Sequence, residues 1–370
     1  MIGLRTLALV LGLTVGLCAQ DSTSGELSAE PEVEPVVTTG GAEQGPPLDT
    51  PERRAAAVRA LADELAALDP DVHRERTRVP KGGVVREPMP VSPEQASAQA
   101  AQRVAAWQAW LTEPGSEAAA IWAGRRLAYE GRYRDAQRAY DLGLTLHPQS
   151  FKLLRHRGHR SISQREFGLA VEDLSAALAL TVGVADDWEP DGQPNAQGIP
   201  RSTHHSNIRY HLALAHYLRG EFGAAAGLWS ESFDVARNDD MRVSSGWWAW
   251  LAARRAGAGW EQTAGRILDR IPEDPAELEI LENDDYHLLL LMAKGLRSPE
   301  QLLGEGDDSI AGATRAYGVA AWLALQGEND RSQAQLESTV QGSAWAAFGF
   351  IAAEADLARL RASRPGTSPR

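Results

Sequence analysis

One short stretch, Arg155-His156-Arg157-Gly158-His159-Arg160, concentrates the most unusual chemistry of this sequence, because five of its six residues can carry positive charge. Guanidinium groups bind carboxylates through two parallel hydrogen bonds, so the stretch could recognise an acidic side chain or a chain end. Alternatively, its arginines pair within the chain with Asp186, Asp187 or Glu189, since half-buried arginines are normally paired. The sequence leaves both alternatives open.

Histidines in and after this stretch raise the question of a metal. Two imidazoles one helical turn apart can chelate zinc, copper or nickel. The residues concerned are His156, His159, His204, His205, His211 and His216. No third ligand follows at a diagnostic spacing, and there is no His-Glu-x-x-His run. We therefore predict no metal site and no cofactor.

Signatures of catalysis are absent from the sequence. It contains no Gly-x-Ser-x-Gly elbow and no Gly-x-x-x-x-Gly-Lys phosphate loop. Its one cysteine, Cys18, lies in the leader, so the mature chain offers no nucleophilic thiol. The absence of a motif does not exclude an enzyme. It gives no reason to propose one, and no catalytic residue is predicted.

A repeat between Ala118 and Leu180, spaced about 34 residues apart, must position these side chains. The first copy carries Gly124, Gly131, Tyr133, Ala136, Tyr140 and Pro148, and the second carries Gly158, Phe167, Ala170, Leu174 and Ala177. Small residues at these points let paired helices approach closely, while larger ones fill the space between pairs. The pattern resembles tetratricopeptide repeats. The resemblance implies an all-α, right-handed α-solenoid of about five helical hairpins, with a helical N-terminal cap and a disordered acidic leader.

In tetratricopeptide repeats, the first helix of each pair lines a concave surface and supplies the ligand contacts at its second, fifth, ninth and twelfth positions. Carried onto this sequence, the resemblance implies a locally cationic groove with aromatic walls. The partner-binding residues that it implies are Arg125, Tyr129, Lys152, Arg155, His159, Asn207, Tyr210 and Tyr217. We expect the partner to be another protein or peptide with acidic or carboxylate features.

Composition and turn residues divide the chain into successive segments. These are a signal peptide (1–19), a disordered acidic linker (20–48), an N-terminal helical cap (49–116), repeats 1–2 (117–182), an insertion loop (183–205), repeats 3–4 (206–272), degenerate C-terminal helical repeats (273–360) and a flexible tail (361–370). Helix starts are predicted at Ser92-Pro93, Asn238-Asp239 and Asn283-Asp284, because capping residues precede apolar patterns there.

The N-terminus has the pattern of an export signal. Arg5 precedes an apolar core that is too short to span a bilayer, and small residues follow at Cys18 and Ala19. Cleavage there would make the protein periplasmic or envelope-associated. Cys18 could be lipidated as in a bacterial lipoprotein, or removed with the signal. We therefore expect the protein to associate with a membrane only through an N-terminal lipid anchor.

Adjacent tryptophans mark the fourth repeat unit. Trp247 and Trp248 cannot point the same way on one helix, so we expect one of them to face outward. Packing between the third and fourth repeats is the expected role of this group, because tryptophan is usually largely buried.

The net charge of −13, without a dominant basic stripe, argues against nucleic acid as the partner. We expect a non-catalytic protein-binding scaffold of the bacterial cell envelope that recruits its partner through the cationic groove. The alternative is a small-ligand or metal-binding protein, or an enzyme, whose site forms where the 183–205 insertion folds over the groove. A closed pocket lined by Arg157, His159, His205 and Asp191 would favour this alternative.

Overall fold

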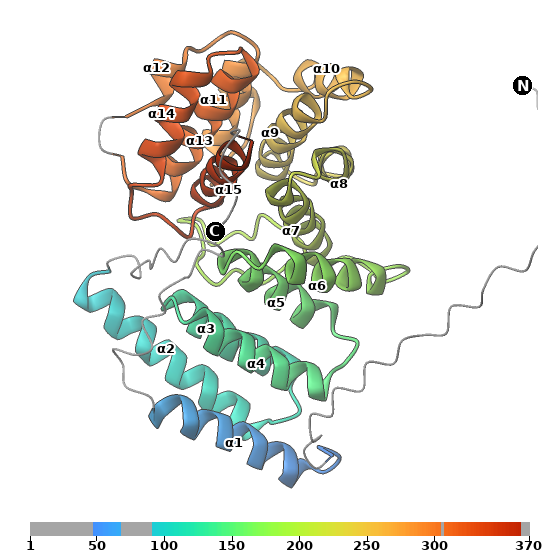
Figure 1. Ribbon diagram of the computed structural model, residues 1–370. Helices are drawn as coiled ribbons and strands as arrows, with labels where there is room; N and C mark the ends of the chain where they lie inside the picture. The colour runs from blue at the N-terminus through green and yellow to red at the C-terminus, as the bar shows by residue number, and fades with distance from the viewer. Residues whose placement is uncertain (1–46, 68–90, 305–306, 364–370) are drawn as a thin grey trace, which may run out of the picture. The chain divides into compact units, whose positions relative to one another are not determined.

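The structure of the protein, a computed structural model, describes residues 47–67, 91–304 and 307–363. The secondary structure in these ranges is helical (Figure 1). Within these ranges there is no β-strand, and Trp188 and Thr203 form one isolated antiparallel bridge. The predicted all-α class is confirmed. The predicted signal peptide, Cys18 and nearly all of the acidic linker lie outside the described residues.

The helices follow one another from the N-terminal cap to the C-terminus. They are α1 (Pro51–Ala67), α2 (Pro93–Thr112), α3 (Glu117–Tyr129), α4 (Tyr133–Leu146), α5 (Phe151–Ser163), α6 (Phe167–Leu180), α7 (His204–Arg219), α8 (Phe222–Asp234), α9 (Asp239–Ala256), α10 (Glu261–Asp269), the 3₁₀ turn η1 (Pro275–Glu277), α11 (Asp284–Ala293), α12 (Pro299–Leu302), α13 (Ile310–Leu325), α14 (Asn329–Thr339) and α15 (Phe348–Ala362). No helix in the described ranges is both long and apolar enough to cross a bilayer.

Local capping sets several of these helix starts. Ser92 accepts a hydrogen bond from the Gln95 amide in a capping box at the start of α2, and Asn238 caps α9 through the Met241 amide. Both predicted starts are confirmed. The start predicted at Asn283 is confirmed as well, because α11 begins at Asp284, although the Asn283 side chain makes no capping bond.

Consecutive helices pack as pairs, and glycines allow the close contact. In the α3–α4 pair, a Cβ on Gly124 would lie 2.2 Å from the Tyr140 ring, and in α5–α6 a Cβ on Gly158 would lie 2.7 Å from Leu174. The first helices α3, α5 and α7 also contact one another in sequence. The small residues of the repeat therefore let each helix approach its partner, as the pattern predicts.

The C-terminal helix α15 packs against α13, α14 and the earlier helix α7 (Figure 1). Arg359 donates to the carbonyl of Leu218 at the end of α7, at 2.8 Å. Asp356 accepts two hydrogen bonds from Arg255 of α9, at 2.7 and 2.8 Å. These contacts hold α15 against α7 and α9.

The expectation that Trp247 or Trp248 faces outward is wrong. Trp247 is 0% exposed and Trp248 is 1% exposed. Helix α9 packs against α8 and α10 and also against α11 and α13, so residues on opposite sides of the helix are both covered. Trp248 stacks on Trp229 of α8 with ring centroids 5.2 Å apart, which agrees with packing between the third and fourth units.

Candidate ligand-binding site

Glu189 of the 183–205 insertion reaches into the cationic groove predicted from the sequence. Its side chain is 5% exposed, and its Oε1 lies 3.3 Å from Nη2 of Arg155 and 3.9 Å from Nη1 of Arg125. Asn207 donates to Oε2 at 2.9 Å. Two histidine nitrogens lie near the same carboxylate, those of His156 at 3.7 Å and His204 at 3.6 Å. The arginines therefore pair within the chain, one of the two alternatives left open by the sequence.

Backbone hydrogen bonds fix the insertion so that Glu189 points inward. The Glu189 amide donates to the Ser202 carbonyl at 3.0 Å, and the His204 amide donates to the Asp187 carbonyl at 3.0 Å. Thr203, between these bonds, caps α7 through the Ser206 amide. The two ends of the insertion thus meet at the first turn of α7, beside Arg155.

Electrostatics at Glu189 favour its ionised form. Burial raises the pKa of Glu189, but the charges of Arg155 and Arg125 outweigh it and hold the pKa well below its usual value. Burial, followed by the charge of Arg155, keeps the pKa of His156 well below its usual value, so this imidazole is neutral. One carboxylate therefore faces two guanidinium groups, and the cluster stays cationic.

A cavity of about 320 Å³ adjoins this cluster and shares Asn207 with it. Its walls come from the first halves of α7 and α9, the end of α8, the start of α11, the insertion, and the first residues of α13 and α15. The lining residues are Arg201, Ser202, Ser206, Asn207, Tyr210, His211, Ser232, Met241, Ser244, Ser245, Glu282, Asn283, Tyr286, Ile310 and Phe348. The volume lies within the range of small-molecule sites.

Aromatic side chains line part of this cavity. The Tyr210 and Tyr286 hydroxyls are 3.2 Å apart, and the Tyr210 and Phe348 rings are 6.2 Å apart. His211 lies edge-on to Phe348, and its Nδ1 donates to the Asn207 carbonyl at 2.6 Å. Burial, followed by the charge of Arg155, lowers the pKa of His211 to about 3. His211 is therefore neutral at physiological pH, and its Nε2 is a hydrogen-bond acceptor.

Asp240 holds the loop at the cavity rim. It is fully buried and accepts hydrogen bonds from Arg201 Nε at 2.6 Å and from the amides of Glu282 and Asn283 at 2.8 and 3.1 Å. Glu282 is thereby fixed at the rim, where its carboxylate accepts a hydrogen bond from Asn195 of the insertion at 2.6 Å. Burial, followed by the charges of Asp191 and Asp240, raises the pKa of Glu282.

Of the predicted groove residues, two line the cavity and most of the others are covered by the chain itself. Asn207 and Tyr210 line the cavity. Tyr129 is covered by the insertion, since a Cβ on Gly192 would lie 1.9 Å from its hydroxyl, and its ring neighbour Arg125 donates to the Pro190 carbonyl at 2.7 Å.

Three further residues of the predicted groove, His159, Tyr217 and Lys152, make other contacts. The His159 ring contacts His211 at 4.2 Å between centroids and Phe348 at 5.5 Å. Tyr217 is fully buried, with its hydroxyl 2.5 Å from that of Tyr317. Lys152 lies over the Phe151 ring.

The residues Arg157, His159, His205 and Asp191, named as a mark of the alternative function, make other contacts. Arg157 makes hydrogen bonds to Asp173 at 2.6 and 2.8 Å and to Asp141 at 2.7 Å. The His205 amide donates to Asp186. None of the four lines the 320 Å³ cavity. The insertion still closes over the groove, but it does so through Glu189.

Several cavity residues were missed because they lie in the degenerate units. Met241, Ser244 and Ser245 belong to α9, while Tyr286 and Phe348 belong to α11 and α15, beyond the clear repeats. One sequence signal pointed to the region, namely the Asn-Asp-Asp runs that begin α9 and α11. The side chain of Asp240, in the first of them, organises the rim.

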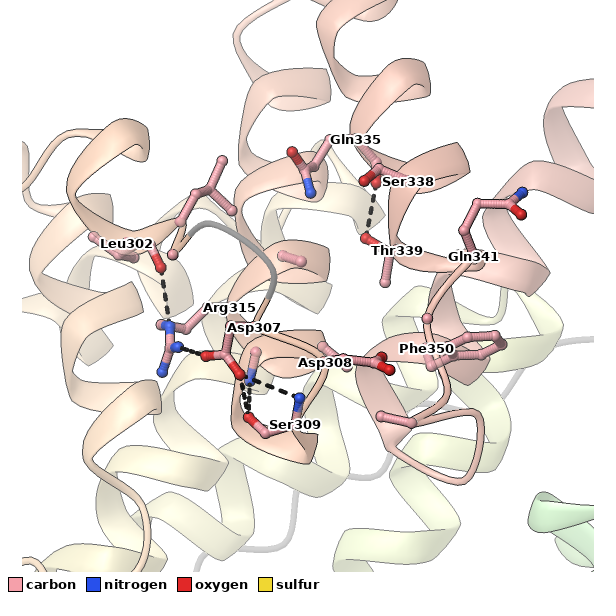
Figure 2. A pocket seen from close by; sticks show the side chains of 17 residues that line it. Leu302, Asp307, Asp308, Ser309, Arg315, Gln335, Ser338, Thr339, Gln341 and Phe350 are labelled. Carbon is pink, nitrogen blue, oxygen red and sulfur yellow. Dashed lines mark hydrogen bonds and ion pairs between the residues drawn. The ribbon is translucent and has the colours of Figure 1, made fainter. Parts of the chain in front are cut away.

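A second cavity of about 400 Å³ lies between α13 and α14 (Figure 2). Arg315 lines one side of it beside Leu302 and Asp307, as Figure 2 shows, and donates to the Leu302 carbonyl at 2.9 Å. Its guanidinium also pairs with Asp285 and Asp307. Asp308 accepts a hydrogen bond from the Ser343 amide at 2.6 Å. The charged groups of this cavity thus pair with α11, with the end of α12 and with the loops beside α13 and α14. Among the described residues, no group of three or more histidine, cysteine or acidic side chains is placed to hold a metal ion.

Comparisons with protein-family models and with curated proteins identify no relative of this chain. Function is therefore inferred from the arrangement of the side chains.

Proposed function

We propose that this chain is a non-catalytic binding protein that holds a small polar molecule in the 320 Å³ cavity between α7, α9 and α11. The observation that carries the proposal is the position of this cavity: two of the predicted ligand-contact residues, Asn207 and Tyr210, line it, and insertion residues Arg201 and Ser202 close one side. Concave sites with an apolar wall and a few convergent polar groups are typical of small-molecule binding.

Occupation of the groove by the chain itself favours a small ligand over an extended peptide. Glu189 already lies between Arg125 and Arg155. A peptide segment that paired with these arginines would have to displace Glu189.

Hydroxyl groups in the cavity favour binding over catalysis. Four lining serines donate to backbone carbonyls: Ser206 to Thr203, Ser232 to Leu228, Ser244 to Asp240 and Ser245 to Met241. A serine nucleophile instead needs its proton directed at a histidine or another base. These four serines therefore serve as polar lining.

The proposal includes a tetratricopeptide-like solenoid and export to the bacterial cell envelope. Support for the solenoid comes from the successive packing of α3–α4, α5–α6 and α7–α8 and from the close contact at Gly124 and Gly158. Support for export comes from the apolar run after Arg5. N-terminal sequencing of the protein from cell fractions tests this, and an intact Met1 in the cytoplasmic fraction would contradict it.

Filling the cavity tests the binding function. Ser244→Leu places a larger side chain in the lining, whereas the control Ser338→Leu makes the same change at the 400 Å³ cavity. A fragment library is screened by ligand-observed NMR on the mature chain. We expect fragments that bind wild type and Ser338→Leu but not Ser244→Leu. Fragment binding that is equal in all three proteins, or absent from all three, would contradict the proposal.

Recruitment of a partner protein is the second candidate, favoured by a surface hollow of about 610 Å³ on the outside of the insertion. Trp188 and Ile199 are 45% and 46% exposed there, beside Arg237 and Arg242. Exposed tryptophan next to arginine is typical of interaction hot spots. Affinity capture from an envelope extract with wild type and Trp188→Ala tests it. An unchanged set of captured proteins would rule out this surface.

A further inference from the structure

We infer that the ligand of the 320 Å³ cavity is a neutral saccharide of one or two rings. This inference rests on the proposed function, because it names the class of molecule that the same cavity binds. Three properties of the lining carry it: the balance of charge, the surplus of hydrogen-bond acceptors and the aromatic wall.

Charges around the cavity disfavour a cationic ligand on the α7 side. The cluster beside Asn207 has two guanidinium groups, Arg125 and Arg155, for the single carboxylate of Glu189. After burial, the charge of Arg155 is the largest cause of the low pKa of His211, and Arg160 lowers it further. Burial and the positive charge of this cluster, which together keep His211 neutral, also oppose an ammonium group bound beside it.

An anionic ligand is disfavoured on the opposite side. Glu282 lines the rim there, and Asp191 and Asp240 raise its pKa after burial, which shows that further negative charge is unfavourable at this point. The lining cation, Arg201, is already paired with Asp240 at 2.6 Å and donates to the Glu279 carbonyl. The cavity thus offers no unpaired cation among its described lining residues, and a neutral molecule fits it best.

Hydrogen bonding in the cavity calls for a ligand rich in donors. Ser244 and Ser245 have committed their protons to backbone carbonyls, so their oxygens remain as acceptors. Asn207 donates from its amide nitrogen to Glu189 and Ser202, which leaves its carbonyl oxygen. The Glu282 carboxylate and the His211 Nε2 add to these acceptors. Sugar hydroxyls supply several donors without carrying charge.

Tyr210, Tyr286 and Phe348 supply the apolar surface that a sugar ring also requires. A pyranose presents a face of C–H bonds, whose positive edge packs on the negative face of an aromatic ring. The tyrosine hydroxyls are 3.2 Å apart and share one hydrogen bond. Polar acceptors facing an aromatic wall therefore match a saccharide.

A panel of neutral mono- and disaccharides, each with its amino-sugar and uronic-acid analogue, tests the inference by saturation-transfer NMR and calorimetry on the mature chain. The triad N-acetylglucosamine, glucosamine and glucuronate varies charge on one ring. We expect at least one neutral saccharide to bind, with its charged analogues weaker by about tenfold or more. Ser244→Leu should abolish binding, and Ser338→Leu should retain it.

The outcomes separate this inference from the proposed function. If fragments bind in the cavity but no neutral saccharide does, the saccharide assignment is wrong and the binding function stands. Tighter binding of the amino or acidic analogue would also overturn the assignment. If neither fragments nor saccharides distinguish Ser244→Leu from Ser338→Leu, both proposals fail.

Discussion

The carboxylate of Glu189 lies 3.3 Å from the guanidinium of Arg155, and both side chains are at most 10% exposed. Arg155 belongs to α5 and Glu189 to the insertion that follows α6, so this contact ties the loop to the helical frame. Burial lowers the pKa of Arg155, but the charge of Glu189 raises it again, so each group depends on the other to stay ionised in the interior.

Glu189→Gln should destabilise the protein strongly, because it leaves Arg125 and Arg155 without their counter-charge. Removing one partner of a buried ion pair costs about 3–5 kcal/mol in the free energy of unfolding. The control is Glu221→Gln, whose side chain is 39% exposed and pairs with Arg219 at 2.7 Å. That change should cost no more than about 1 kcal/mol. Urea unfolding measures both, and similar losses would contradict the buried role of Glu189.

A small carboxylate should partly replace the missing side chain in Glu189→Ala. The variant keeps Arg125, Arg155 and Asn207 around the vacated position, which is a carboxylate site built by the chain itself. We expect acetate to raise the melting temperature of the variant. At an acetate concentration of ten times its Kd, the free energy of unfolding should increase by about 1.4 kcal/mol. Chloride at equal ionic strength and wild-type protein serve as controls. A rise of the same size in either control would show a general salt effect.

Features set by neighbouring residues were predictable from the sequence. The starts of α2 and α9 depend on Ser92 and Asn238, whose side chains bond amides three positions later. Contact of Gly124 with Tyr140 follows from the repeat, since both residues recur at fixed steps within one helical pair. Helix class and pairing therefore came from local patterns.

The candidate site depends on contacts that no local pattern encodes. Glu189 reaches Arg155 only because the bridge between Trp188 and Thr203 folds the insertion back. Phe348 completes the cavity from α15, and a single sequence carries no signal that α15 packs against α7. Arginine pairing was foreseen as an alternative, whereas the choice of Glu189 over Asp186 or Asp187 required the structure.

Stability should fall as the pH decreases below about 6.5, in part through His211, whose pKa is lowered to about 3 by burial first and by Arg155 next. The unfolded chain then binds one proton that the folded chain does not, so stability rises with pH between these two values. The slope from this one group is about 1.4 kcal/mol per pH unit. His159 and His156, whose pKa values burial also lowers, contribute in the same direction.

Urea unfolding of wild type and His211→Leu at pH 7 and pH 5 measures this dependence. We expect the loss of stability between the two pH values to be smaller in the variant by about 1–2 kcal/mol. His216→Leu is the control, because its imidazole is half-buried and bonds to Glu221 near the surface. An unchanged loss in His211→Leu would show that His211 is not held neutral in the folded protein.

Gly124→Ala should destabilise the first helical pair, because the added Cβ would lie 2.2 Å from Cε1 of Tyr140, a ring that is 1% exposed and has little room to move. Overpacking of this kind costs about 1–3 kcal/mol. Gly265→Ala in α10 is the matched control, since nothing lies within 4 Å of its Cβ position. Alanine there should stabilise the helix by about 0.5–1 kcal/mol, because it has the higher helix propensity. Opposite shifts in melting temperature are expected, and equal shifts would mean that α3 and α4 do not pack at Gly124.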